Sequence, residues 1–124
     1  MNPEAEKDGV WVEYGKGVSF KIAYGQNRKF RNRASFYYKK HSKLLDMDTD
    51  ASRDKMEEIT VQVMAETVLT DWRGAVKLQG ETLEYSVANA KRLLAVEKFR
   101  DWVSSQANDM AKFKAVQEAE DEGN

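Results

Sequence analysis

Apolar and polar residues alternate in two short segments near the start of the chain, residues 10–14 and residues 18–24. This alternation is typical of strands with one buried face, and Gly15-Lys16-Gly17 between the segments favours a tight turn. The sequence therefore predicts a β-hairpin over residues 10–24. Because a lone hairpin is marginal in water, its apolar face is expected to cover another part of the fold. The apolar positions of that face are Val10, Val12, Tyr14, Val18, Phe20, Ile22 and Tyr24.

Beyond the hairpin, apolar residues recur at the three- and four-residue spacing of helices. Asn27 and Ser86 stand at positions suited to N-caps. Apolar residues lie on more than one side of the second predicted helix, which indicates a central position in the fold. The pattern predicts four helices, over residues 28–45, 51–72, 86–95 and 97–116.

The segment between the second and third helices predicts a corner. Trp72 is expected to end the second helix as a large apolar anchor, and Gly74 to adopt the left-handed conformation just past a helix end. The residues that follow, up to Tyr85, predict a short turn or mini-hairpin. Tyr85 precedes the Ser86 cap at the position of a hydrophobic staple. The corner is expected to dock the last two helices on the central one.

These elements predict a mainly α protein with a small N-terminal β-hairpin, an α+β fold. The length of 124 residues suits one domain, which we expect over residues 9–116. Residues 1–8 and the acidic residues 117–124 are expected to be disordered. No apolar run approaches the roughly 20 residues of a membrane span, and the charged N-terminus lacks a secretory signal. We therefore expect a cytoplasmic protein that does not contact a membrane.

The formal net charge of −1 conceals two blocks of opposite sign. Residues 28–43 contain seven basic residues and no acid, whereas residues 46–71 contain eight acids and two basic residues. Adjacent blocks of this kind can pair as neighbouring helices, within one fold or between subunits.

Catalytic motifs are absent from the sequence, and we expect neither an enzyme nor a cofactor. The chain contains no Cys and a single His, His41, within an apolar helical stripe. That position favours a packed or half-exposed histidine. Lys16 and its flanking glycines do not have the spacing of a phosphate-binding loop, and no GxGxxG sequence occurs.

Acidic residues at the start of the second predicted helix partly fit a calcium loop. Asp46, Asp48, Asp50 and Glu57 occupy positions 1, 3, 5 and 12 of an EF-hand. Position 6, however, is Ala51 where the sharp turn needs Gly, and position 8 is Arg53 where an apolar residue is usual. We therefore expect this segment to cap a helix and expect no metal site.

The basic block also fits nucleic-acid binding, because Phe36, Tyr37 and Tyr38 are interleaved with its basic residues. At helical spacing, these aromatic residues are expected to face the core and the basic residues to form a solvated face. The chain as a whole is not basic, unlike most nucleic-acid binders. Nucleic acid is therefore an unlikely partner on this pattern, and binding through residues 28–43 is kept as an alternative.

The order of several short motifs resembles the tail assembly chaperones of long-tailed, siphovirus-type bacteriophages. Members typically carry a G-V-W-V hairpin, a W-x-G signature, a G-E/K-x-L-x-Y-S turn and an F-R-D-x-V closing helix. The matching segments are residues 9–12, 72–74, 80–86 and 99–103, and the residues that carry them include Trp11, Trp72, Gly74, Tyr85, Ser86 and Phe99. Relatives often have Ser-Pro-Glu-Asn where this chain has Ser86-Val87-Ala88-Asn89, so the favourable N1 proline is missing.

The resemblance implies a non-enzymatic protein that binds the phage tape measure protein, keeps it soluble and assists tail tube polymerisation. It also implies a protein of the host cytoplasm that is absent from the mature virion, with possible contact to the tail tube protein and with self-association. A structural tail or head-tail joining protein is the other alternative. The expected partner-binding residues lie on the basic helix and the last helix: Arg28, Lys29, Arg31, Arg33, Trp102, Met110 and Phe113.

Overall fold

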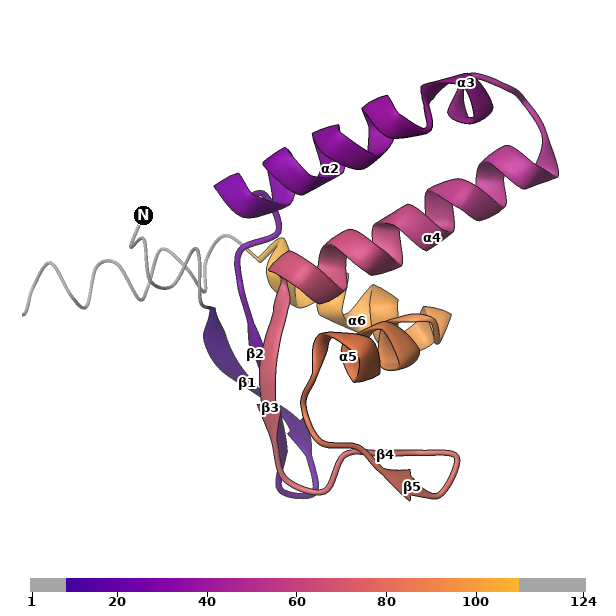
Figure 1. The fold of residues 1–124 in the computed structure, drawn as a ribbon. Helices are drawn as coiled ribbons and strands as arrows, with labels where there is room; N and C mark the ends of the chain where they lie inside the picture. The colour runs from indigo at the N-terminus through magenta and orange to yellow at the C-terminus, as the bar shows by residue number, and fades with distance from the viewer. Residues whose placement is uncertain (1–8, 110–124) are drawn as a thin grey trace, which may run out of the picture.

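The computed structural model describes residues 9–109 and has an α+β fold, as predicted. Figure 1 shows a small antiparallel sheet, a helical hairpin that projects from one end of it, and two further helices beside it. Within the described residues, no helix combines the length and the apolar character needed to cross a bilayer.

Strands β1 (Val10–Gly15) and β2 (Val18–Ile22) form the predicted hairpin. Strand β2 is the central strand of a three-stranded sheet, because β3 (Leu69–Arg73) pairs antiparallel with its other edge. The register is irregular in two places. A bulge in β1 between Glu13 and Gly15 leaves Tyr14 without a partner across the β1–β2 ladder, and the pairing of β2 with β3 shifts between Lys21 and Ile22.

The predicted helix over residues 51–72 is wrong at its C-terminal end. Helix α4 (Asp50–Thr67) stops five residues earlier, and the chain continues directly into β3. Trp72 therefore lies on a strand, opposite Phe20 of β2. Pairing with β2 gives the backbone of β3 its hydrogen-bond partners and places Leu69 in a fully buried position.

Gly74 consequently follows a strand and does not end a helix. Its φ of +93° lies in the region that favours glycine, as predicted. The glycine is needed for a close backbone contact, however, and not for the end of a helix. The residue passes against the carbonyl of Gly17 in the β1–β2 turn, and a Cβ atom at this position would overlap that backbone. The glycine permits the corner after β3 to pack against the hairpin turn.

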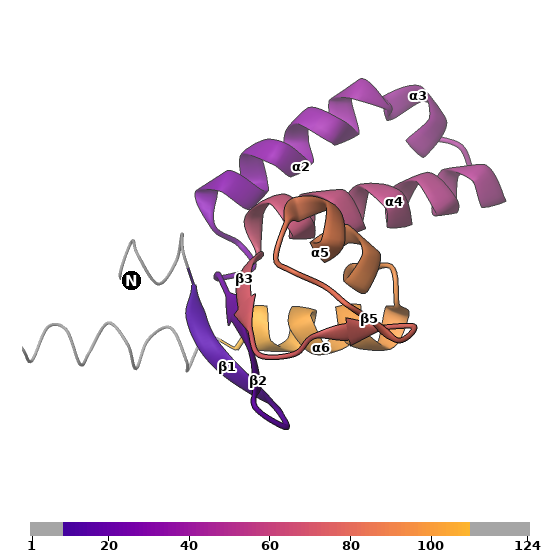
Figure 2. The same ribbon diagram turned by 60° about the horizontal axis from the view of Figure 1, so that its bottom comes forward.

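The predicted helix over residues 28–45 is divided in two, α2 (Arg28–Lys40) and α3 (Ser42–Leu45). The half-buried His41 separates them, and its backbone N–H donates to the carbonyl of Tyr37. Helix α2 lies alongside α4, as Figure 2 shows from a second direction, and a small apolar cluster joins the two helices. The buried members of that cluster are Ala34, Ile59 and Val63.

The segment after β3 contains the predicted mini-hairpin, β4 (Lys77–Leu78) and β5 (Glu81–Thr82), followed by α5 (Val87–Leu94) and α6 (Glu97–Ala107). The predicted last helix over residues 97–116 is wrong at residues 108–109, because α6 ends at Ala107, and its part beyond residue 109 lies outside the described residues. Both helices contribute buried residues to the main core, which they form together with β2, β3 and α4.

Two aromatic side chains hold the corner to the sheet. The indole Nε1 of Trp72 donates a hydrogen bond of 3.0 Å to the carbonyl of Leu83, and the hydroxyl of Tyr85 donates one of 3.2 Å to the carbonyl of Leu69. The rings of Trp72 and Tyr85 meet edge to face, with centroids 5.1 Å apart. The corner therefore closes on β3, and Ser86 then caps α5 as predicted by accepting from the N–H of Asn89 at 3.0 Å.

Asn27 joins three segments of backbone with one buried side chain. Its Oδ1 accepts from the N–H of Phe30 at 2.8 Å, which is the predicted N-cap of α2. Its Nδ2 donates to the carbonyl of Tyr24 at 2.7 Å and to the carbonyl of Thr67 at 3.1 Å. Both polar atoms of the side chain are therefore hydrogen-bonded, and the side chain connects the end of the hairpin, the start of α2 and the end of α4.

Replacement of this cap tests its wider role. We expect Asn27→Ala to lower the free energy of unfolding by about 2–4 kcal/mol, because two carbonyls and one N–H each lose a hydrogen bond at a buried site. The matched control is Ser86→Ala, which removes a cap with only one such bond and should cost about 1 kcal/mol. Urea denaturation of both variants gives the comparison. Equal losses would mean that the bonds from Asn27 Nδ2 contribute nothing.

Candidate functional site

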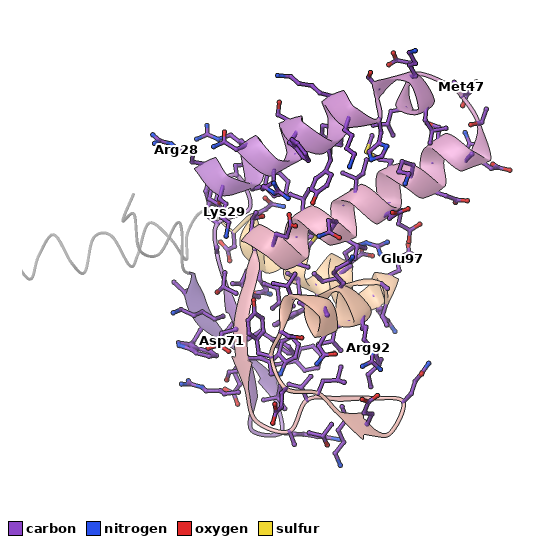
Figure 3. All side chains as sticks on the ribbon, in the orientation of Figure 1. Arg28, Lys29, Met47, Asp71, Arg92 and Glu97 are labelled. Atoms are coloured by element: carbon purple, nitrogen blue, oxygen red, sulfur yellow. The ribbon has the colours of Figure 1, made fainter. Side chains whose placement is uncertain are left out.

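The basic face of α2 is the first candidate interaction surface. Arg28, Lys29 and Arg31 are exposed, as are three basic residues nearer the end of the helical hairpin. Figure 3 shows Arg28 and Lys29 at the start of α2, with Met47 at the opposite end of the hairpin. Within residues 9–109, none of these six basic side chains forms an ion pair. The other three are Lys39, Lys40 and Lys43.

Arg33 differs from the other basic residues because it faces α4. Its Nε donates to Glu66 at 3.0 Å, and a second guanidinium nitrogen donates to the hydroxyl of Tyr37 at 2.8 Å. Burial raises the pKa of Glu66, but hydrogen bonds from Arg33, Gln62 and Tyr37 outweigh it, so the pKa lies below its ordinary value of 4.5. Arg33 is thus engaged within the fold and is less available to a partner than predicted.

The aromatic residues of α2 do not all face the core, and that expectation is wrong for two of them. Tyr37 packs toward α4 and donates its hydroxyl to Glu66 at 3.1 Å. Phe36 and Tyr38, however, are 51% and 40% exposed. Successive residues of a helix point about 100° apart, so three consecutive aromatic residues cannot share one packed face. The outer face of α2 therefore carries aromatic as well as basic side chains.

Trp102 is half-buried in a cluster of aromatic rings between the sheet and α6. Its ring lies 4.9 Å from that of Tyr14 and 5.8 Å from that of Phe20, and it stacks on Phe99 at 6.0 Å. Phe99 and Trp102 therefore contribute to packing. The other two residues predicted to bind a partner from the last helix, Met110 and Phe113, lie outside the described residues.

Trp11 lies on the opposite face of the sheet, which α6 does not cover. It is 39% exposed, and the guanidinium carbon of Arg73 lies 4.3 Å from its ring centroid. The ammonium group of Lys21 lies 6.0 Å from the same ring. These are cation–π distances, so the tryptophan of the hairpin motif is held by neighbouring strands and remains partly accessible.

Three of the four acidic residues that resemble a calcium loop form ion pairs with arginines. Arg53 pairs with Asp48 at 2.9 Å and with Asp50 at 2.6 Å, and Arg100 pairs with Glu57 at 3.2 Å. Thr49 caps α4 by accepting from the N–H of Ser52 at 3.1 Å. In the part of the chain that the structure describes, no three potential ligand side chains converge as a metal site requires.

A hollow of about 620 Å³ lies between α4 and α5. Its α4 side carries carboxylates, including Asp54 and Glu58, and its α5 side carries Lys91 and Arg92. Arg92 already pairs with Glu81 at 2.8 Å. Because the two walls have opposite charge, the hollow favours neither an anionic nor a cationic ligand.

A smaller apolar groove of about 310 Å³ lies between the β1–β2 turn and the start of α6. The hydrophobic pattern does not reveal this groove, because its lining comes from three separate parts of the chain, residues 14–20, 75–78 and 93–99. The one local signal is Lys16, a bulky residue between two glycines in a turn.

The Arg33–Glu66 pair makes stability depend on pH. Because the pKa of Glu66 is lowered in the folded state, its carboxylate stabilises the fold above pH 4.5, and this contribution is lost as the pH falls through the lowered value. We expect Glu66→Gln to lower the Tm at pH 7, and the difference from wild type to shrink toward pH 3. The exposed Glu58→Gln is the control, with an effect within about 0.5 kcal/mol. A difference that is constant with pH would contradict this role.

Comparison with known proteins places the chain in a phage family. The family model described as YdaY prophage protein matches residues 25–124, from the end of the hairpin onward. No curated protein and no solved structure gave a significant match. The match covers most of the chain and includes α2, the corner after β3 and both closing helices. The chain therefore belongs to the YdaY prophage protein family and is phage-derived.

Proposed function

We propose that this chain is a tail assembly chaperone, which binds the tape measure protein of its phage and keeps it soluble until the tail tube polymerises around it. Two findings support the proposal: the order of the motifs resembles that chaperone family, and the chain belongs to a prophage family. The motif residue Trp72, on β3, also contacts the ring of Tyr85, whose hydroxyl donates to the carbonyl of Leu69 on the same strand. The resemblance therefore rests on residues that act together in the fold.

The single observation that carries the proposal is the outer face of α2. Six exposed basic residues and two exposed aromatic residues share this helix and the turn after it, in a chain with a net charge of −1. Exposed aromatic rings cost free energy in water, and clustered like charges repel one another, so such a face gains by being covered. A long helical protein with apolar and acidic side chains would cover both kinds of group.

The proposal predicts which surface keeps the partner soluble. Co-expression of the wild-type chain with the tape measure protein should move that protein into the soluble fraction. We expect Lys39→Glu/Lys40→Glu to weaken binding on the order of tenfold, about 1.4 kcal/mol, because two attractions become repulsions. The control, Lys91→Glu/Lys98→Glu, changes the net charge equally on α5 and α6.

Two outcomes would contradict the proposal. An equally insoluble tape measure protein with and without this chain would refute chaperone activity. Detection of the chain in purified virions by mass spectrometry, at a copy number comparable to tail components, would favour a structural tail or head-tail joining protein.

Nucleic-acid binding remains the second candidate, and the exposure of Phe36 and Tyr38 beside the basic residues favours it. Bases stack on exposed aromatic rings while basic side chains contact phosphates. Under the chaperone proposal, fluorescence anisotropy with labelled single-stranded DNA and RNA should detect no binding near physiological salt. Tight binding that weakens steeply with salt and is lost in Phe36→Ala/Tyr38→Ala would establish the alternative.

A further inference from the structure

The groove of about 310 Å³ has an apolar floor and an exposed apolar rim. Buried side chains of Phe20, Val76 and Leu93 form part of its lining. Tyr14 and Val96, also in the lining, are 56% and 44% exposed, which is unusual for residues of their size beside a core. This volume is at the lower end of the range for ligand pockets and suits one or two large side chains.

Tyr14 lies on the apolar face of β1 that alternation with Val10 and Val12 predicts. The bulge leaves it without a partner across the β1–β2 ladder. Here the ring of Tyr14 meets Trp102, Phe20 and Phe99 edge to face, at 4.9, 5.6 and 6.0 Å. Packing of this kind holds the rim rigidly in place, so a ligand that contacts it loses little conformational freedom of the protein.

The charged residues that line the groove are all basic. They are Lys16, from the β1–β2 turn, and Lys77, from β4. Within the described residues neither lysine forms an ion pair, and no carboxylate lines the groove. An apolar pocket with two unpaired lysines in its lining complements an apolar side chain that has carboxylates beside it.

Lys16 also occupies an unfavourable backbone conformation. It is the first central residue of a two-residue hairpin turn, with φ of +54°, followed by Gly17 with φ of +78°. Such turns favour Asn or Gly at this position, and a lysine there reduces stability. Asn or Gly at position 16 would therefore stabilise the fold more than Lys16 does, so the fold itself does not require a lysine at this position.

We propose that this groove binds an acidic amphipathic helix of a protein partner, with one large apolar side chain in the pocket and carboxylates against Lys16 and Lys77. A helix presents residues three and four positions apart on the same face, so acids can flank an apolar anchor directly. In an extended peptide the neighbours of the anchor point to the opposite side. The inference rests on the groove alone and holds whether or not the partner is a tape measure protein.

A designed peptide tests the inference without the phage partner. The probe is a helix of about 18 residues, long enough to form in water, with a stripe of Leu and Phe flanked by Glu; its counterpart carries Lys in place of Glu. In a heteronuclear NMR titration of the full chain, the Glu-flanked peptide should shift the amide signals of Lys16, Lys77 and Val96. It should bind at least about tenfold more tightly than the Lys-flanked peptide. Equal affinity, shifts confined to α2, or no shifts would overturn the inference.

Variants of the lysines separate binding from folding. Lys16→Asn suits the turn, so it should keep or raise the Tm while weakening the Glu-flanked peptide about threefold to tenfold. Lys16→Glu/Lys77→Glu should reverse the preference toward the Lys-flanked peptide. The control Lys91→Gln/Lys98→Gln, on α5 and α6 and outside the lining of the groove, should change neither affinity. Folded lysine variants that keep the wild-type preference would refute the groove as the site.

The peptide titration and the co-expression assay can fail independently. Loss of the charge preference in the titration refutes the groove, even where the tape measure protein is kept soluble. An insoluble tape measure protein together with a charge-selective titration refutes the proposed function and leaves the groove as a site for another acidic helix.

Discussion

The buried amide of Asn27 is the interaction on which the arrangement of the elements depends. It bonds to the backbone of the hairpin exit, of the first turn of α2 and of the last turn of α4. The carbonyl of Thr67 has no helical partner once α4 ends, and this amide provides one. The chain can therefore leave the helix at that point and enter β3 without a buried, unsatisfied carbonyl.

The sheet and the main core depend on the end of α4 at Thr67, where the chain enters β3. Strand β3 reaches the free edge of β2, and the resulting sheet presents Phe20, Ile22 and Leu69 to the closing helices. The corner after β3 then returns across the sheet through the hydrogen bonds of Trp72 and Tyr85. Burial raises the pKa of Tyr85, with the charge of Asp71 as a second cause, so its hydroxyl stays protonated and able to donate. The same residues that make the motif recognisable thus fix the positions of α5 and α6.

Charge is distributed over the surface in a way that the net charge does not reveal. The outer face of α2 and the groove beside the β1–β2 turn are both basic, whereas the start of α4 is acidic. At physiological salt, charges are screened beyond about 8 Å, so contacts at each surface matter more than the total. Both basic surfaces complement an acidic partner. They lie on separate elements, which suits a chain that contacts a long helical protein at more than one place.

The sequence by itself determined the hairpin, the caps at Asn27 and Ser86, the mini-hairpin and the α+β class, because each depends on residues close together in the chain. Only the tertiary structure decided that residues 69–73 form a strand and not the end of a helix. Their apolar residues also fit helical spacing, and the choice of a strand comes from pairing with β2, about fifty residues earlier in the chain. The exposure of Phe36 and Tyr38 was decided in the same way, since α4 can cover only one side of α2. The groove likewise exists only where three segments that are distant in the chain meet, and no local pattern encodes such a meeting.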